Sequence, residues 1–66
     1  MLRATVVHDS ISQHHSIEVS DDLRTAKRQA VQEFGMGFVD HTIRIYDDET
    51  RQTITERRIG GIKWSR

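Results

Sequence analysis

Histidine is the residue type in this chain best suited to metal or acid–base chemistry, and it occurs at four positions: His8, His14, His15 and His41. Imidazole nitrogens bind transition metals, and Asp9 could add an oxygen ligand. No HxH or HxxxH spacing places two imidazoles side by side on one element, and His14 and His15 point to opposite faces of an extended chain. We therefore expect no metal site and no cofactor. The pattern is typical of histidines at the surface and at strand edges.

Three serines near these histidines, Ser10, Ser12 and Ser16, are the candidates for a nucleophile. A nucleophile needs an oriented base and an oxyanion site, normally in a concave pocket. A chain of 66 residues is too thin to build a large ligand cleft, and the acidic residues 47–49 are typical of a solvated turn. We therefore expect no catalytic residues and no enzyme activity.

A first basic surface lies on the helix expected between Ser20 and Gly35. Arg24, Lys27 and Arg28 form a local positive patch there. Lys27 lies at the edge of the apolar stripe, so its stem can pack while its ammonium reaches outward. From the pattern alone, a solvated helix face is the commoner interpretation of such a charge cluster.

A second basic surface is expected on the outward face of the sheet. Its cations and aromatic ring could follow phosphates and stack a base. The residues are Arg3, Arg44, Tyr46, Arg57 and Lys63. The alternative is an ordinary solvated face on which Glu18 and Glu56 are cross-strand partners. Trp64 is interpreted as a core residue.

The helix that positions the first surface has signals at both ends. Ser20 can serve as N-cap, Asp21 and Asp22 suit the positive end of the helix dipole, and Gly35 can supply a left-handed stop. Apolar residues spaced three and four apart predict one buried stripe: Leu23, Ala26, Ala30 and Phe34. The residues expected to face away are Arg24, Arg28, Gln29 and Gln32.

Strands are predicted on both sides of the helix from side chains that alternate between apolar and polar. The predicted ranges are 2–8, 15–19, 41–47, 52–58 and a short last strand over 62–64. The inward residues are Leu2, Ala4, Val6, Ile17, Val19, Ile43, Ile45 and Ile54. In the fourth strand, Thr53, Thr55 and Arg57 are predicted to point outward, with a bulge near Arg57 and Arg58 because Ile59 falls on the opposite parity.

The connections are predicted from glycine and polar residues. A loop is expected over 9–14, a turn over 47–50, and a hairpin turn at Gly60 and Gly61. Large apolar side chains of the connection over 35–39 are expected to cover one end of the core.

The whole chain, 1–66, is therefore predicted to be a single compact α+β domain. One helix should pack on one face of a mostly antiparallel, four- to five-stranded sheet, in the order two strands, helix, three strands. Ten basic and ten acidic residues cancel, so net charge does not indicate a general polyanion binder. No apolar run is long enough to span a bilayer and no leader segment is evident, so we expect a cytoplasmic protein.

Three segments carry a family resemblance: IEVSDDLRTAKRQAVQE, TIRIYD and GGIKW. Together they resemble one family of small phage anti-CRISPR proteins that inhibit type I, Cascade-like surveillance complexes. The resemblance covers most of the chain and includes the order of elements, a helix that carries Ala-Lys-Arg, and a strand meander that ends in a tryptophan.

This resemblance implies a protein that acts by occupation in the cytoplasm of an infected bacterial host. It would bind the backbone subunits of the guide-RNA complex and block hybridisation of target DNA. Lys27 and Arg28 match the family's Ala-Lys-Arg, and with Arg24 they are the expected partner-binding residues. The chain departs from the family at Gln32, where the family has a further basic residue, and at Phe34, where the family has a polar contact residue.

Two hypotheses of different classes follow. The first is a protein–protein inhibitor of a nucleic-acid-processing complex, which presents the helix cations. The second is a small nucleic-acid-binding module that uses the sheet face. Direct binding of DNA or RNA by the isolated protein should be negligible under the first and strongly salt-dependent under the second. A third interpretation is an accessory protein of phage or bacterial origin whose partner the residues do not identify.

Overall fold

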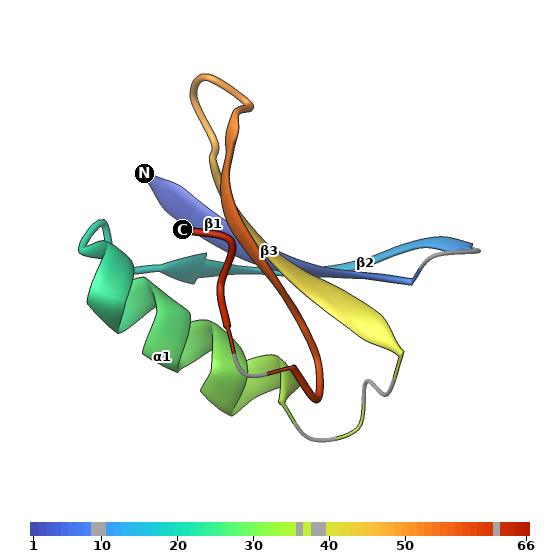
Figure 1. Cartoon of the computed structure of the whole chain (residues 1–66). Helices are drawn as coiled ribbons and strands as arrows, with labels where there is room; N and C mark the ends of the chain where they lie inside the picture. Colours follow the sequence, from blue (N-terminus) through green and yellow to red (C-terminus); the bar gives the residue numbers. More distant parts are fainter. Residues whose placement is uncertain (9–10, 36, 38–39, 62) are drawn as a thin grey trace.

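The computed structural model describes residues 1–8, 11–35, 37, 40–61 and 63–66, with the backbone alone described over 11–14. Its elements, in chain order, are β1 (Leu2–His8), β2 (Ile11–Val19), α1 (Leu23–Phe34), β3 (His41–Asp47) and β4 (Thr53–Arg58). The strands form one antiparallel sheet in the order β2-β1-β3-β4. α1 lies across one face of this sheet (Figure 1). The predicted α+β class is confirmed, with four strands.

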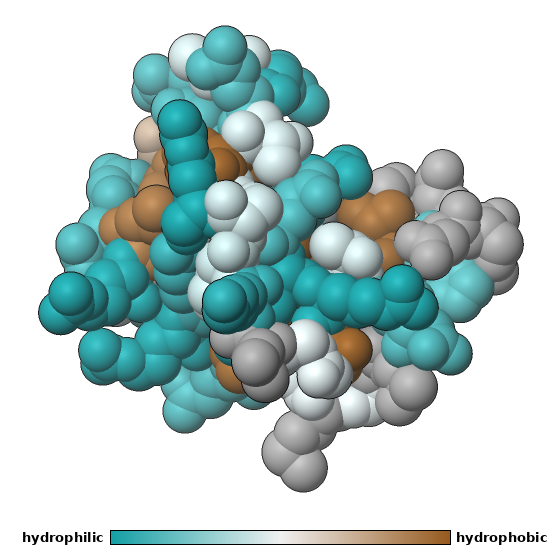
Figure 2. All heavy atoms as spheres, viewed as in Figure 1, coloured by the Kyte–Doolittle hydropathy of each residue, from teal (hydrophilic) through white to brown (hydrophobic). Residues whose placement is uncertain are grey.

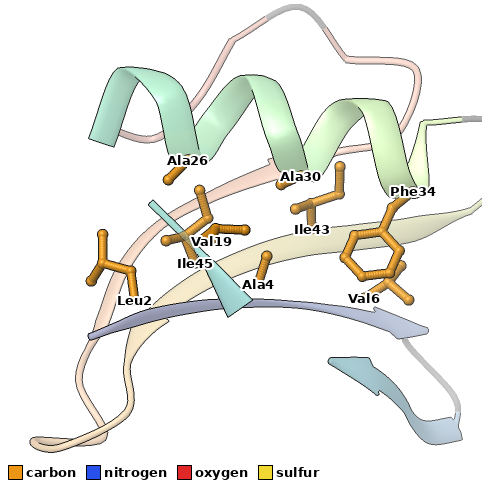
Figure 3. Close-up of a cluster of buried hydrophobic side chains, with 9 residues drawn as sticks. All are labelled: Leu2, Ala4, Val6, Val19, Ala26, Ala30, Phe34, Ile43 and Ile45. Atoms are coloured by element: carbon orange, nitrogen blue, oxygen red, sulfur yellow. The ribbon is translucent and has the colours of Figure 1, made fainter. Parts of the chain in front are cut away.

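The core lies between α1 and the sheet (Figure 3). Its buried apolar residues are Leu2, Ala4, Val6, Val19, Ala26, Ala30, Phe34, Ile43 and Ile45. Half-buried side chains pack around it: Ile17, Leu23, Val31, Ile54, Ile59 and Trp64. Two alanines on the inner stripe let the helix approach the sheet closely, and Phe34 fills the wider space at the end of α1. The predicted inward residues are thereby confirmed.

The central strands β1 and β3 have the predicted bounds, because β-branched residues and strict alternation favour extended backbone in both. β2 is longer than predicted. It begins at Ile11, which pairs with His8, and a register shift between Val6 and His8 accommodates the extra residues of β2. The loop predicted over 9–14 is therefore wrong from Ile11 onward, since pairing with β1 extends this polar segment; residues 9 and 10 lie outside the described part.

The N-terminus of α1 is capped by Asp22, and the prediction of Ser20 as N-cap is wrong. The Asp22 carboxylate accepts hydrogen bonds from the Thr25 amide at 3.1 Å and the Thr25 hydroxyl at 2.6 Å. The Ser20 hydroxyl instead accepts from the Asp22 amide at 3.0 Å. Asp21 lies before the helix and accepts from the Leu2 amide at 3.0 Å. The tie between Asp21 and β1 places the first helical turn after residue 22.

Gly35 ends the helix for a reason other than the predicted one. Its φ is −67°, in the right-handed region, so it does not provide a left-handed stop. A β-carbon at this position would lie 2.4 Å from the Val31 carbonyl oxygen, which the Gly35 amide contacts at 2.7 Å. The lack of a side chain is what this close approach requires. Positive φ occurs instead at Gly37, at 113°.

β4 contains a bulge that the sequence placed elsewhere. Tyr46 pairs with Thr53 and Ile45 pairs with Thr55, so Ile54 is the extra residue. The bulge is at Ile54 and not near Arg57 and Arg58. Because the parity of the strand shifts there, Thr55 and Arg57 point to the helix side. The prediction that these two residues point outward is wrong.

The chain after β4 turns and returns along that strand. The Gly61 amide donates to the Arg58 carbonyl at 2.8 Å and Gly60 has a φ of 92°, so the predicted glycine turn is confirmed. Residues 63–66 do not form the predicted last strand; they make an irregular segment beside β4, shown in red in Figure 1. Ile62 lies outside the described residues.

Hydrogen bonds hold this C-terminal segment, residues 63–66, against β4. The Ser65 amide donates to the Glu56 carbonyl at 2.9 Å, and the Arg66 amide donates to the Thr55 hydroxyl at 3.1 Å. The segment therefore covers the part of the sheet that α1 does not reach. Residues 36, 38 and 39, which were predicted to help cover the other end of the core, lie outside the described residues.

Candidate functional site: a cationic patch around Trp64

A hollow of about 400 Å³ lies between α1 and the C-terminal segment. We call its lining the Trp64 patch: Lys27, Arg28, Val31, Gln32, Arg57 and Trp64. The other helical members lie one, four and five residues after Lys27, and this spacing places all of them on one side of α1. Three of the six residues are cationic, and they come from α1 and β4.

The structure brings two of the three predicted helix cations into this patch. Lys27 and Arg28 line the hollow, whereas Arg24 lies one turn earlier on the same helix and is exposed. Because Arg24 and Arg28 are four residues apart, they are neighbours on the helix surface. Arg24 therefore extends the positive surface along α1 without contributing to the hollow.

Trp64 is the aromatic centre of the patch. The Lys27 Nζ lies 5.8 Å from the centroid of the indole ring, and the Arg57 Cζ lies 5.9 Å from it. Both distances are within the range of cation–π attraction. Trp64 is half-buried and packs against the core, so its interpretation as a core residue is correct only in part.

Backbone carbonyls near the end of the chain position two of the cations. The Lys27 Nζ donates to the Arg66 carbonyl oxygen at 2.5 Å. The Arg57 Nε and Nη2 both donate to the Gly61 carbonyl oxygen, at 3.1 Å and 2.7 Å. The Gly61 carbonyl is a neutral acceptor, so its two bonds fix the Arg57 guanidinium without neutralising its charge.

No ion pair within the described residues involves the cations of the patch. The ion pairs recorded there join the N-terminus to Asp21, Arg44 to Glu56, and Arg58 to Asp40. The patch therefore keeps a local positive charge in a chain whose formal net charge is zero. Figure 2 shows that hydrophilic side chains cover most of the face in view and that its apolar surface is divided into separate small areas.

The start of α1 is also electrostatically linked to these cations. The hydroxyl and amide of Thr25, by donating to the Asp22 carboxylate, lower its pKa below the usual value, and the charges of Arg24 and Arg28 lower it further. Asp22 thus stays ionised at neutral pH. Its hydrogen bonds fix the first turn, from which the helical members of the patch are presented.

The second predicted surface is only partly assembled. Arg3, Arg44 and Tyr46 share the sheet face opposite α1, as predicted. Arg57 is not with them, because the bulge in β4 places it on the helix side. Arg44 Nε donates to Glu56 Oε1 at 2.8 Å, so part of the positive charge of this face is neutralised within the sheet.

The histidines lie at one end of the sheet. The rings of His8 and His41 contact each other edge to face, with centroids 4.8 Å apart and planes at 65°. In the part of the chain that the structure describes, no group of three histidine, aspartate or glutamate residues is arranged to hold a metal ion. The Ser16 hydroxyl contacts Tyr46 and Arg3.

Two patch members, Arg57 and Trp64, were missed as functional partners of the helix cations. The parity of β4 assigned Arg57 to the wrong face, and no local pattern reveals a bulge that depends on pairing with β3. Trp64 was a weak indication, because tryptophan, with an apolar ring and a polar N–H group, is enriched at interfaces.

Comparison of the chain with protein-family models, curated proteins and solved structures finds no match. In the described ranges, no helix has the length and apolar character needed to cross a bilayer.

Proposed function

We propose that this chain is a non-enzymatic inhibitor that binds the backbone subunits of a type I CRISPR surveillance complex and blocks hybridisation of target DNA. One observation carries the proposal. Lys27 and Arg28, which match the Ala-Lys-Arg of the anti-CRISPR family, lie with Arg57 around the half-buried ring of Trp64, and none of the three cations is in an ion pair within the described residues. Such an inhibitor acts in the cytoplasm of an infected bacterium.

The chemistry of the Trp64 patch supports a protein partner. Tryptophan and arginine are the residues most enriched at the energetic centres of protein interfaces, where water is excluded. Val31 and the stems of Lys27 and Arg57 give the hollow apolar walls, while their charged ends form its rim. Charged rim groups contribute mainly to association rate and to specificity, and buried aromatic groups contribute to affinity.

The size of the molecule determines how far such an interface must extend. A standard interface buries about 800 Å² on each partner, which is about one sixth of the 4602 Å² surface of this chain. The hollow alone is too small, so the contact must continue along the exposed side of α1. Arg24 lies on that route, which assigns it a role at the edge of the interface.

The test compares two single charge reversals on opposite faces. Arg28→Glu reverses a cation of the patch, and Arg51→Glu makes the same change in charge at an exposed residue on the side away from α1. Binding to a purified type I complex is measured by biolayer interferometry, and target-DNA hybridisation by gel shift. A cationic patch would contact acidic groups of the partner, and like-charge contacts at an interface cost several kcal/mol. We therefore expect Arg28→Glu to weaken both binding and inhibition by at least tenfold.

Arg51→Glu should bind and inhibit as the wild type does. Equal binding by both variants would show that α1 is not the interface. No binding of the wild type to any type I complex would contradict the proposal itself and leave the accessory-protein interpretation.

The runner-up function, a nucleic-acid-binding module on the sheet face, has less support. That face lacks Arg57, and Arg44 is paired with Glu56. A fluorescence-anisotropy titration of labelled single- and double-stranded DNA with the isolated protein separates the two. We expect negligible binding at physiological salt; tight, steeply salt-dependent binding would favour the runner-up.

A further inference from the structure

The centre of the sheet face opposite α1 contains a buried hydroxyl group without a partner. Thr5 lies on the central strand β1, and its exposed fraction is 7%. Its Oγ1 has no hydrogen-bond partner within the described residues. Because a buried polar group without a partner costs folding free energy, this hydroxyl is unusual and points to a ligand that would satisfy it.

Thr5 is one of the residues that line a hollow of about 320 Å³, separate from the Trp64 patch. We call it the open-face hollow, and it is lined by Thr5, Ser16, Arg44, Tyr46, Arg51 and Thr53. In the register of the sheet, Thr5 lies opposite Ser16 on one side and Arg44 on the other. Four hydroxyl groups and two guanidinium groups thus border one space, and no carboxylate lines it.

Part of the positive charge around the hollow is available to a ligand. Arg44 uses its Nε to contact Glu56 at 2.8 Å, which leaves its terminal nitrogens to donate elsewhere. Arg51 is exposed at the rim and takes part in none of the ion pairs recorded in the described ranges. Arg3 lies close by, because its Nε donates to the Ser16 hydroxyl at 3.0 Å.

We propose that the open-face hollow binds one phosphate group. A phosphate presents several acceptor oxygens in tetrahedral directions, which suits donors that converge from three strands and a turn. Arg44 and Arg51 supply charge, and the Thr5 and Ser16 hydroxyls donate from the floor. The ring of Tyr46 borders the remaining space, where an attached sugar or base would lie.

Access to Thr5 requires a small rearrangement. The oxygens of Ser16 and Tyr46 are 3.3 Å apart, which is long for a hydrogen bond between hydroxyls. A weak contact of this kind opens at little cost, and its opening lets a phosphate oxygen reach Thr5. Phosphate thereby provides the partner that the Thr5 hydroxyl lacks.

The test is a titration of the ¹⁵N-labelled protein, followed by NMR, with inorganic phosphate in one arm and uridine 5′-monophosphate in the other. Sodium chloride is reduced in step so that ionic strength stays constant. We expect saturable shifts confined to amides around the hollow, including those of Thr5, Ser16 and Arg44. Saturation by either probe supports the site, and the tighter of the two identifies free or nucleotide-borne phosphate as the source.

Two variants probe the site, and a third is the matched control. Arg51→Gln removes a charge and Thr5→Val removes the hydroxyl while keeping the shape; each should weaken phosphate binding about tenfold, as the loss of a hydrogen bond to a charged group does. Arg24→Gln removes an exposed charge from α1 and should leave the affinity unchanged. Shifts that do not saturate, or equal affinities for all three variants and the wild type, would overturn the proposal.

Discussion

Lys27 and Arg28 are neighbours in the sequence with different structural roles. Lys27 is half-buried, and its ammonium is held by the Arg66 carbonyl beside the indole of Trp64. Arg28 is exposed at the rim of the same hollow. One residue therefore helps to build the Trp64 patch, and the other only adds charge to it.

This difference predicts how each charge reversal affects stability. Arg28→Glu should change the free energy of unfolding by no more than about 0.5 kcal/mol, as exposed substitutions usually do. Lys27→Glu should cost about 0.5 to 1.5 kcal/mol, because it removes the hydrogen bond to Arg66. Urea denaturation followed by circular dichroism measures both. The variant that combines Lys27→Glu with Arg28→Glu should still fold, so a loss of partner binding by it can be attributed to the Trp64 patch. Equal stability of the two single variants would mean that the contact with Arg66 contributes nothing.

Replacing Thr5 is predicted to stabilise the fold, whereas the charge reversals on α1 are not. Thr5→Val should raise the free energy of unfolding by about 1 kcal/mol in phosphate-free buffer, because it removes a buried hydroxyl without a partner and keeps the side chain's shape. Thermal unfolding in the presence and absence of phosphate measures this. A loss of stability without phosphate would mean that the hydroxyl is already satisfied.

At the scale of elements, α1 depends on a narrow contact with the sheet. Two of its three buried residues are alanines, so Phe34 is the one large side chain among them. In a chain of this size, the remaining core has little free energy in reserve.

We therefore predict that Phe34→Ala unfolds the domain or lowers its stability by about 3 to 5 kcal/mol. Differential scanning calorimetry at neutral pH measures the effect. Phe34→Leu, which keeps most of the apolar volume, is the milder control and should remain folded. An unchanged melting temperature for Phe34→Ala would contradict the burial of Phe34 between α1 and the sheet.

The Asp22 cap of α1 predicts that the stability of the fold depends on pH. The Thr25 hydroxyl, the Thr25 amide and the nearby arginines lower the pKa of Asp22 from its usual value of 3.8. A carboxyl whose pKa is lower in the folded state stabilises the fold at pH values above its unfolded pKa, and this contribution is lost as the pH falls through the folded pKa. Asp22→Ala should therefore reduce stability at pH 7, and the reduction should become smaller as the pH falls through the folded pKa.

Urea midpoints of the wild type and of Asp22→Ala at a series of pH values test this cap. Thr25→Val is the informative companion, because it removes the hydroxyl that is the largest cause of the lowered pKa. A difference between the wild type and Asp22→Ala that stays constant from pH 7 to pH 2 would contradict the proposed ionisation.

Helices and strands with strong local preferences could be predicted from the sequence. The register between paired strands, and the residue at which the helix begins, could not. β1 and β3 were predicted residue for residue, because they are central strands whose alternation fits burial on one face. The bulge at Ile54 depends on how β4 pairs with β3, so the sequence placed it wrongly and with it the direction of Arg57. The cap was missed by two residues because Ser20 and Asp22 have similar capping chemistry, and only the contact between Asp21 and β1 distinguishes them.

The candidate site was predicted in the same partial way. Lys27 and Arg28 follow from helical periodicity, and the resemblance implies them independently. The sequence did not predict that they lie beside Trp64 and Arg57, because this arrangement depends on the hydrogen bonds that hold the C-terminal segment against β4. Trp64 was interpreted as a core residue, but its ring is only half-buried and also lines the hollow.

At the scale of the whole molecule, the two faces of the sheet have different chemistry. One is closed by α1 and the C-terminal segment, which present the Trp64 patch on their outer side. The other is open and carries the hydroxyl-lined hollow at its centre. A partner protein and a phosphate group could therefore bind at the same time on opposite sides of one thin domain.

The fold as a whole should not require a metal ion. We predict that EDTA leaves the melting temperature of the purified protein unchanged, since the histidine spacing does not assemble a tetrahedral site. A thermal scan with and without the chelator, at equal ionic strength, is sufficient. A decrease of several degrees would show that a metal stabilises the fold and would direct attention to His8 and His41.

The central pairing of β1 with β3 also bears on the order in which the contacts of the sheet form during folding. These strands pair along their whole length, from Leu2 with Asp47 to His8 with His41. Each outer hairpin closes a short loop, whereas the central pair joins segments separated by all of β2 and α1. Because closing a longer loop costs more entropy, we expect the pairing of β1 with β3 to form more slowly than either outer hairpin. Until these two strands pair, the apolar side chains on their inner face have no partner strand to pack beside, so we expect aggregation to compete most with folding at this stage.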